Sequence, residues 1–471
     1  MKNAILTLCA LSLAGCVVGP DYQRPNASAP ANFQQAAQPE LPGQSPGSIA
    51  QLNWWSVFND PFLGSLEEQC LANNQDLQAA VARTDQARAF SDIARSYSLP
   101  TVAAGAGVSR VREPRDRPNG AKASNFTDLI TSISLSYEVD AWGRVRRSRE
   151  AASAAQQASQ ADLETVRLSL TSELAVAYFS LRVLDVQQRI LADTVKGLQE
   201  SLDITTLRYH NGLSSKLDLQ QAQTLLNSEL AQKSALGIGR RHFETAIAVL
   251  AGRPASEFTI AALPLMGAPP QISPGLPLDL LAHRSDIAER ERTLAVRSAQ
   301  IGVAQAERLP AVSLTGAAGF ESTDAGTLLN WAANRSYAVG SGIAAPLFNA
   351  GRLKARASAS EASYREAEAL YRQNVLVAFG EVETQLNALH VLADQASFQE
   401  AAVESARQAT SIALDRYRNG IESYLSVVTQ QTVQLQNELA AAQIAGARFI
   451  STINLIKALG GGWADSQIYR L

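Results

Sequence analysis

Two carboxylates that stand close together in the sequence, Glu138 and Asp140, are the pair best suited to acid–base chemistry. They occupy alternate positions of a predicted strand and therefore share one face of it. Glycoside hydrolysis requires such a pair, but an acidic strand end that faces water has the same pattern. The histidines show neither His-x-x-x-His nor Glu-x-x-His spacing, so they predict no metal site: His210, His242, His283 and His390. We therefore expect no catalytic, cofactor-binding or metal-binding residues, and a protein that is not an enzyme.

A covalent modification is predicted at Cys16. Lys2 precedes an apolar run from Ala4 to Leu13, and two small residues then lead to Cys16. This pattern is typical of an export signal, here residues 1–15. It resembles the bacterial lipobox, in which cleavage leaves the cysteine as the N-terminal residue that carries lipid such as palmitate. Val17 stands where an inner-membrane retention signal commonly has Asp, so the resemblance implies the outer membrane. A plain secretory signal with a chance cysteine is the alternative.

Composition excludes several classes of protein. The 41 Lys and Arg against 44 Asp and Glu leave a net charge of −3, which predicts no attraction to nucleic acid. The 46% hydrophobic content is ample for packed structure. Cys70 has no partner thiol once Cys16 is acylated, so we expect a buried, unpaired cysteine. No run of about 18 uncharged apolar residues follows the leader, so a spanning helix is not expected and a bilayer would be crossed by strands.

The chain repeats itself. Residues 208–217 read RYHNGLSSKL and residues 416–425 read RYRNGIESYL, an offset of 208. Two further landmarks keep the same order: Gly143-Arg144 recurs as Gly351-Arg352, and Leu99-Pro100 recurs as Leu309-Pro310 at an offset of 210. Two copies of a large unit indicate a duplication rather than an array of short repeats.

Each repeat is predicted to end in a long helical hairpin. Apolar residues from Leu163 to Leu202 step by three or four, as in a coiled-coil seam, and the second copy has the same rhythm from Phe379 to Ala396. At 1.5 Å per residue, a helix from Arg144 to Asn211 would be roughly 100 Å long. An Asn-Gly pair then predicts a turn in each copy. The expected helices are 144–211 with 217–250, and 352–419 with 425–459.

Alternating apolar and polar residues predict two strand hairpins, at 100–140 and 310–348. From Leu129 to Val139 the odd positions are mostly apolar and the even positions mostly polar, and three other runs alternate similarly, the last from Tyr337 to Leu347. Polar loops at 113–125 and 321–336 separate the members of each pair. Strands of about 9 to 11 residues span a bilayer when tilted. A soluble, half-buried sheet gives the same alternation and is the alternative.

Four strands cannot close, and bilayer-spanning strands cannot leave an edge unpaired. We therefore expect a barrel that is shared between copies, with the faces rich in Ser, Thr and Gly lining a wet lumen. Closure with at least eight strands needs two or more copies. Periodicity alone does not choose among two, three and four.

Short motifs at both ends of the chain carry a family resemblance. They are CVVGPDY at 16–22, Trp54-Trp55, FNDP at 58–61 and KALGGGW at 457–463. Together with the duplicated hairpins, they resemble the lipoprotein branch of the TolC/OprM-type outer-membrane efflux factors over essentially the whole mature chain. The resemblance implies a mainly α fold with a membrane β-barrel: a homotrimer whose twelve-stranded barrel, four strands per chain, continues into a long periplasmic α-helical barrel.

The same resemblance implies a function. It is that of the outer-membrane exit duct of a tripartite efflux system, which passively conducts drugs or other small solutes. The implied partners are a periplasmic adaptor (membrane fusion) protein, an inner-membrane RND-type transporter and outer-membrane lipid, with no nucleic acid. A lipoprotein that braces the envelope, or a duct for a secreted polypeptide, are the alternatives, although a brace needs no amphipathic strands. The sequence does not identify the exported substrate.

A duct needs a gate, and the hairpin tips are where copies could converge. Charged side chains there could repel one another, attract cations and be released by partners. The gate candidates are Asp218 in the first copy and Asp415, Tyr417, Arg418, Glu422 and Tyr424 in the second. The family often has carboxylates near the positions of Ser426 and Thr429, and their absence favours a polar or apolar constriction. Each candidate could instead be an ordinary solvated turn residue. By resemblance, the second tip is expected to be the mobile one.

The predicted organisation follows the repeats. A signal peptide (1–15) precedes a lipidated N-terminal and equatorial segment (16–64), a first repeat (65–270), a second repeat (271–459) and a C-terminal equatorial segment (460–471). The repeats contain the helical hairpins 143–250 and 351–459. One departure from the family is Arg284-Ser285-Asp286, where Arg-Pro-Asp is usual. We expect Ser285 to cap the following helix and the fold to be unaffected.

Overall fold

The computed structural model describes residues 17–26, 30, 32–33, 53–114, 123–265, 267–273, 277 and 282–463. The predicted signal peptide and Cys16 lie outside these residues, as does 464–471. Within the described part, the same order of elements occurs twice. The first set is α4 (Gln75–Ser96), β1 (Thr101–Glu113), β2 (Ser124–Val139), α5 (Arg144–His210) and α6 (Lys216–Leu250); the second is α8 (Ser285–Ala306), β3 (Ala311–Ser322), β4 (Arg335–Ala344), α10 (Arg352–Arg418) and α11 (Tyr424–Ala458).

The chain forms two compact units, and each takes segments from both repeats. One comprises residues 1–26, 83–160 and 289–372 and contains the strands; we call it the sheet unit. The other comprises residues 27–82, 161–288 and 373–471 and contains the hairpin tips; we call it the hairpin unit. Four further elements occur among the described residues: η2 (Trp54–Phe58), α3 (Pro61–Asn73), η3 (Ala255–Glu257) and α9 (Trp331–Asn334).

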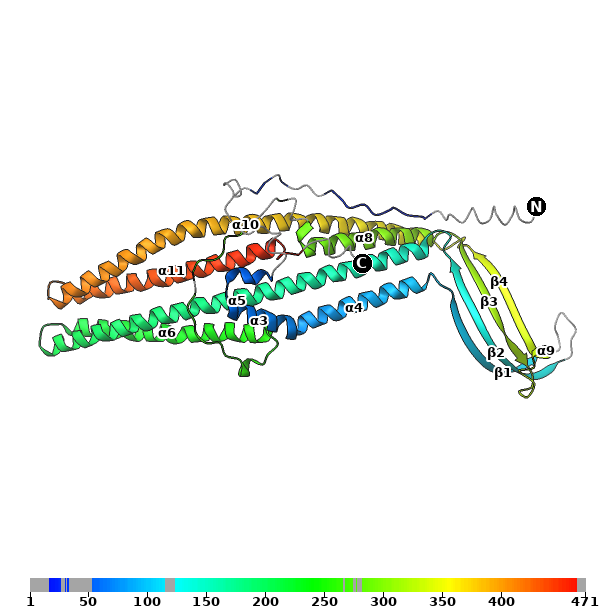
Figure 1. The fold of residues 1–471 in the computed structure, drawn as a ribbon, viewed down its shortest axis with the longest axis horizontal. Coiled ribbons are helices and arrows are strands. Elements are labelled where there is room, and N and C mark those ends of the chain that lie inside the picture. The colour runs from blue at the N-terminus through cyan, green and yellow to red at the C-terminus, as the bar shows by residue number, and fades with distance from the viewer. Residues whose placement is uncertain are drawn as a thin grey trace. The chain divides into compact units, whose positions relative to one another are not determined.

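The sheet unit holds one antiparallel sheet in the order β1-β2-β3-β4 (Figure 1). The two predicted strand hairpins are thus joined to each other through β2 and β3, where Ile133 pairs with Ala318. Within the described residues, β1 and β4 are the outer strands and each has one neighbour. Both outer edges of this sheet are therefore available to another chain.

The strand predictions are confirmed, with one correction at the end of β4. Alternation continues to Leu347 in the sequence, but β4 ends at Ala344, which pairs with Ala311, the first residue of β3. Pro310 directly precedes Ala311, and Pro346 lies two residues after Ala344; neither proline can donate a backbone hydrogen bond to extend the ladder. The loop expected at 321–336 also contains α9, whose N-cap is Asn330.

The helical hairpins have the predicted bounds to within a residue. α5 and α10 are both 67 residues long, and α6 and α11 are both 35 residues long. On α5 the seam residues Leu170, Leu174, Leu181, Leu191 and Leu198 are buried. On α10 the seam is covered less evenly, because Phe379 and Val382 are buried whereas Ala393 is exposed.

Residues of the predicted equatorial segment 16–64 and of α3 pack against α5 and α11. Trp54, Leu63 and Leu66 share a core with Phe179 of α5 and Phe449 of α11. The Phe179 and Phe449 rings stack with centroids 4.6 Å apart. Cys70 belongs to the same core and is a free thiol, as expected.

A buried ion network holds the segment that follows α6. Asp185 accepts from Arg182 at 3.0 Å and from Arg240 at 2.8 Å. The same carboxylate accepts the backbone N–H of Leu263 at 3.2 Å, and Arg240 donates to the Ile260 carbonyl. Each charge faces an opposite charge, which offsets part of the cost of burying it, while Arg182 Nε and Nη2 have no hydrogen-bond partner among the described residues.

α11 is the helix that bears on the expectation that no helix spans a bilayer. Among the described residues it is one helix that is long and apolar enough to cross a bilayer by length and composition. Half of its most apolar window is buried inside the chain, however, as in the core helix of a globular protein. Its residues Phe449, Ile453 and Ile456 pack in the core with α5. The apolar character of α11 is explained by this packing.

Candidate functional site at the helical hairpin tips

The two hairpin turns have the same backbone geometry. Gly212 and Gly420 adopt φ values of 71° and 72°, in the left-handed region that favours glycine. Leu213 N–H donates to the Arg208 carbonyl at 2.8 Å, and Ile421 N–H donates to the Arg416 carbonyl at 2.9 Å. These are the Schellman bonds that satisfy the last carbonyls of a helix. The Asn-Gly signal in each repeat is thus realised as predicted.

Asp218 serves the first turn as a capping residue. Ser215 caps α6 by accepting the Asp218 N–H, and Asp218 in turn accepts the Ser215 N–H at 3.0 Å and the Ser214 hydroxyl at 2.8 Å. Partial burial would raise the pKa of Asp218, but these hydrogen bonds outweigh it and hold the pKa below its usual value. The carboxylate is therefore ionised and fixed within its own hairpin.

Tyr417 and Tyr424 lie together in the interior of the chain. Their ring centroids are 5.3 Å apart, and both side chains are at most 3% exposed. They pack with Ala222 of α6, Ala413 of α10 and Val427 of α11, and we call these five residues the tyrosine cluster. Ala222 belongs to the first repeat, so this cluster joins the two hairpins of one chain.

Polar groups of α5 complete the contact between the hairpins. Thr205 Oγ1 and the Tyr417 hydroxyl are 3.2 Å apart. The Arg208 guanidinium lies 5.0 Å from the Tyr417 ring centroid and donates to the Arg418 carbonyl at 3.3 Å. The partners of Arg208 are therefore an aromatic face and a backbone carbonyl of the other repeat.

The remaining gate candidates lie on the surface of the second tip. Arg416 pairs with Glu422 at 2.7 Å across the turn, and Arg418 lies 3.7 Å from Asp415. These pairs are largely exposed, so each contributes little to stability. The second tip thus combines a buried aromatic contact with weak surface ion pairs.

The Tyr424 hydroxyl is the one polar group of the tyrosine cluster whose burial is not compensated. It has no hydrogen-bond partner among the described residues. Burial, followed by the nearby Tyr417 and Asp218, raises the pKa of Tyr424 to about 12. The tip therefore carries a small energetic defect at the contact between the repeats.

The carboxylate pair at the end of β2 is engaged with the start of α5. Glu138 binds Arg144 through two hydrogen bonds of 2.7 and 2.6 Å. Asp140 accepts the backbone N–H groups of Val145 and Arg146, both at 2.9 Å. Carboxylates at a helix N-terminus are favourable because they satisfy unpaired N–H groups. Both residues therefore join strand to helix.

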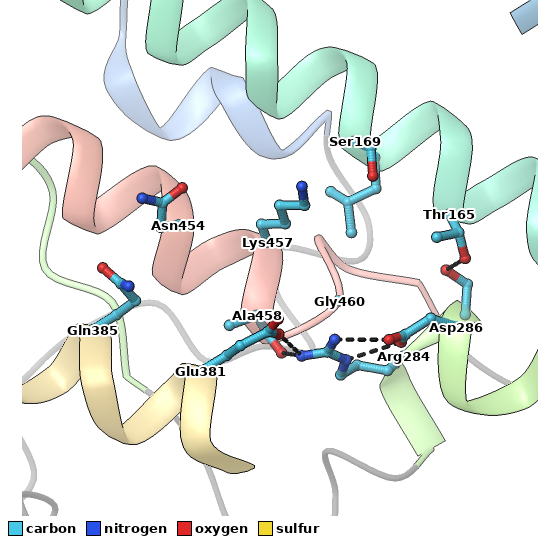
Figure 2. A pocket seen from close by; sticks show the side chains of 12 residues that line it. Thr165, Ser169, Arg284, Asp286, Glu381, Gln385, Asn454, Lys457, Ala458 and Gly460 are labelled. Carbon is cyan, nitrogen blue, oxygen red and sulfur yellow. Dashed lines mark hydrogen bonds and ion pairs between the residues drawn. The ribbon is translucent and has the colours of Figure 1, made fainter. Parts of the chain in front are cut away.

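Arg284, in the hairpin unit, lines a polar pocket of about 380 Å³ at the start of α8 (Figure 2). Its guanidinium pairs with Asp286 at 2.8 Å and Glu381 at 2.6 Å, and donates to the Ala458 carbonyl at 3.0 Å. It thereby fastens α8 to α10 and to the end of α11. Ser285 Oγ lies 2.8 Å from Thr165 Oγ1, a hydrogen bond that proline could not make. The expectation that Ser285 caps α8 is wrong, because Ser285 is the first residue of the helix and its hydroxyl is engaged with Thr165.

Several of these contacts were not foreseen from the sequence. Thr205 was not singled out, although it stands three residues before Arg208 on the same helix. Its partner Tyr417 is distant in the chain, and no periodic signal reports such a contact. Glu67 of α3 was also not singled out from the sequence, although its carboxylate is buried without a hydrogen-bond partner among the described residues.

Comparison with known proteins identifies the family. The profile of the outer membrane efflux protein family matches residues 66–253 and 276–461. The pyoverdine export outer membrane protein OpmQ of Pseudomonas aeruginosa is 33% identical over 99% of this chain and 98% of its own. The toluene efflux pump outer membrane protein TtgF of Pseudomonas putida is 31% identical over 98% of each chain.

The fold agrees with the same group. The solved structure of the outer-membrane channel OprN has a TM-score of 0.87, with 30% identity, 95% of this chain covered and 100% of that chain. The likeness extends over both repeats, the sheet and the hairpins. The chain therefore belongs to the outer membrane efflux protein family of transport channels.

Proposed function

We propose that this outer-membrane efflux protein works as a shared, passive exit duct, in which three copies join their sheets into one twelve-stranded barrel. The observation that carries the proposal is the four-stranded sheet, whose outer strands β1 and β4 each have a neighbour on one side only among the described residues. Its strands are 10 to 16 residues long, enough to cross a bilayer when tilted. The resemblance to this family supports three copies, since three sheets of four strands close a barrel with a wet lumen.

A passive duct in the outer membrane requires partner proteins in the periplasm and the inner membrane. A passive channel in the outer membrane has no energy source of its own, so a transporter in the inner membrane must deliver the solute. The two membranes are bridged if a periplasmic adaptor protein meets the hairpin tips. We propose an RND-type transporter and a membrane fusion protein in these roles.

The exported solute is a small molecule whose identity the transporter sets. OpmQ is named for pyoverdine and TtgF for toluene, yet the two are almost equally similar to this chain at 33% and 31% identity. A siderophore and an aromatic solvent share little chemistry. Overall sequence identity to these relatives therefore does not identify the solute that this chain exports.

The tips are proposed as the gate. The second tip is held by the tyrosine cluster, by Arg208 and by exposed ion pairs, and helical hairpins can swing as units about their far ends. Asp415, Arg418 and Glu422 would leave their weak surface pairs, and Tyr417 and Tyr424 would separate from the first hairpin. Asp218 would keep its capping role in either state.

Lipidation at Cys16 would add a second hold on the membrane. One acyl-type anchor combined with other membrane contacts gives stable attachment. Labelling with palmitate should mark the wild-type protein and not Cys16→Ser. An unlabelled wild type would refute the lipoprotein assignment and leave the duct standing.

The proposed duct is tested by the native mass of the purified protein and by the release of dye from proteoliposomes. Protein extracted from outer membranes should have the native mass of a trimer and should let a small entrapped dye leave proteoliposomes once the tips are loosened. A folded monomer, or liposomes that remain tight with every tip variant, would refute the proposal.

A further inference from the structure

The strand register assigns every residue of the sheet to one of its two faces. Residues that pair directly across antiparallel strands share a face, and successive residues of one strand alternate between the faces. One row of partners runs across all four strands: Ala106, Thr131, Phe320 and Arg335. The face that contains this row also carries most of the exposed large apolar residues of the strands, and we call it the apolar face: Val102, Val108, Ile133, Leu135, Leu314, Tyr337, Val339 and Ile343. The opposite face, which is rich in Ser and Gly, is the polar face.

The charged residues of the strands are divided between these two faces by sign. The carboxylates lie on the polar face: Glu113, Asp128, Glu138 and Glu321. The arginines lie on the apolar face: Arg110, Arg112 and Arg335. Within the four strands, which the structure describes over their whole length, the apolar face thus holds three positive charges and no negative charge.

The three arginines stand near the ends of their strands, at the end of the sheet where α9 lies (Figure 1). Arg110 is eight residues from Val102, and Arg335 is eight residues from Ile343. Eight residues extend for about 27 Å along a strand, which is close to the apolar band of about 25 Å on a membrane barrel. The proposed duct turns the apolar face to lipid and the helices to the periplasm. The arginines therefore lie at the headgroup level of the outer leaflet.

No carboxylate among the described residues neutralises these guanidiniums. Arg110 donates to Thr127 Oγ1 at 3.1 Å, and Arg335 lies 5.9 Å from the Trp331 ring centroid. All three arginine side chains are exposed. An arginine on the lipid-facing side of a barrel is tolerated only near the interface, where its charge can meet polar groups. Guanidinium binds phosphate through paired hydrogen bonds, so phosphate is the headgroup chemistry that this surface fits.

Aromatic side chains lie at the same level as the arginines. The Trp331 ring meets the ring of Phe320, a residue of the apolar face, edge to face with centroids 5.9 Å apart. Trp331 itself is 68% exposed, and Tyr337 follows Arg335 two residues further along the same face. Trp and Tyr are favoured where acyl chains give way to headgroups. These rings therefore give the surface an apolar part beside its positive charges.

We propose that this end of the apolar face binds the phosphorylated glycolipid of the outer leaflet, lipid A, with Arg110, Arg112 and Arg335 on its phosphates and Trp331 beside its acyl chains. The inference rests on the proposed duct and adds a lipid-binding site to it. Charge complementarity selects this occupant. Lipid A carries phosphates at both ends of a disaccharide and no cationic group, whereas a zwitterionic phospholipid brings its own cation. The surface has three guanidiniums and no carboxylate to compete with the lipid.

Binding of lipid A to the detergent-purified protein tests the site. Native mass spectrometry should show lipid A bound to the wild type, and the triple variant Arg110→Gln, Arg112→Gln, Arg335→Gln should bind it at least about tenfold more weakly. The matched control removes three exposed cations from α5 and α6: Arg189→Gln, Lys196→Gln and Lys233→Gln. It should bind as the wild type does. An equal loss in both triple variants would show that net charge alone attracts the lipid and would overturn the site.

The choice of probe tests the lipid class. Lipid A that lacks one phosphate should bind more weakly, and neither phosphatidylglycerol nor inorganic phosphate at the same concentration should displace lipid A. Displacement by either would overturn the assignment to the glycolipid. Replacing the three arginines by lysine keeps their charge and should still weaken binding, because lysine cannot form the paired hydrogen bonds. A conducting wild-type trimer without affinity for lipid A would refute this site and leave the duct intact, whereas a monomeric wild type would refute the duct.

Discussion

The guanidinium of Arg208 lies over the ring of Tyr417, 5.0 Å from its centroid, so the first hairpin tip rests on the second. Arg208 also donates to the Arg418 carbonyl. One residue of the first repeat is thus bound to two residues of the second, at the hairpin tips where the gate is proposed. Opening of the proposed gate would break this contact, because Tyr417 would move away with the second hairpin while Arg208 stays with the first.

Removing this guanidinium should loosen both tips. We expect Arg208→Ala to cost about 0.5 to 2 kcal/mol at the tip, the range for a cation–π contact. Hydrogen exchange followed by mass spectrometry should then show faster exchange in residues 201–222. Arg416→Ala is the matched control, since Arg416 occupies the equivalent position but pairs with Glu422 at the surface, where the expected effect is small. Equal loss of protection in both variants would contradict the role given to Arg208.

The buried hydroxyl of Tyr424 should make the tip sensitive to alkali. Its folded pKa of about 12 lies above the ordinary value of 10, so the folded state keeps the proton that the unfolded state loses. The contribution is constant below pH 10, and stability declines as the pH rises from 10 to 12. Tyr424→Phe should remove this part of the decline and should be neutral or stabilising at pH 7, because the hydroxyl has no hydrogen-bond partner among the described residues. Hydrogen exchange at the tip at pH 8 and pH 11 measures the difference, and identical pH dependence in both proteins would contradict it.

Glu67 should be neutral at physiological pH. Both carboxylate oxygens are buried without a hydrogen-bond partner in the described part of the chain, and burial raises the pKa to about 9. The unfolded state ionises near pH 4.5, so stability should fall as the pH rises from 4.5 towards 9, by about 3 kcal/mol at pH 7. Glu67→Gln should lack this slope. Unfolding by denaturant at pH 5 and pH 7.5 would reveal it, and parallel behaviour of the two proteins would show that Glu67 is ionised and compensated.

The two faces of β2 should respond differently to charge. Ile133 lies on the apolar face of the strand and Ser134 on the polar face. Ile133→Arg should hinder insertion by about 2 to 4 kcal/mol if that face meets the bilayer centre. Ser134→Arg should insert normally and change ion selectivity. The amount of heat-resistant trimer in outer membranes measures insertion, and the reverse ranking would place the apolar face in the lumen.

The helices were more predictable from the sequence than the ends of the strands. Gly143 and Gly351 mark where α5 and α10 begin, and the Asn-Gly turns mark where they end, so the predicted bounds agree to one residue. The end of β4 was missed because alternation describes side chains, whereas Pro310 and Pro346 limit the backbone ladder.

The turn residues of the site were predictable, and the contact between the tips was not. Gly212, Gly420 and the capping residue Asp218 act within a few positions of the chain, so local rules describe them. The approach of Thr205 and Arg208 to Tyr417 depends on how two repeats pack. Tyr417 and Tyr424 were singled out as gate candidates, but the cluster that buries them includes Ala222 from the other hairpin, which no local pattern indicates.

Single-channel conductance in planar bilayers tests the central claim, a passive duct closed at its second tip. The wild type should insert as a trimer of low conductance. Tyr424→Ala, which removes the buried ring, should raise conductance strongly, and Glu422→Lys, which breaks an exposed pair, should raise it less. The same experiment on Ser214→Ala and Lys216→Ala should leave conductance low. If these first-tip variants open the channel while Tyr424→Ala stays closed, the gate belongs to the other repeat; if no variant conducts although all insert, the protein is not a duct.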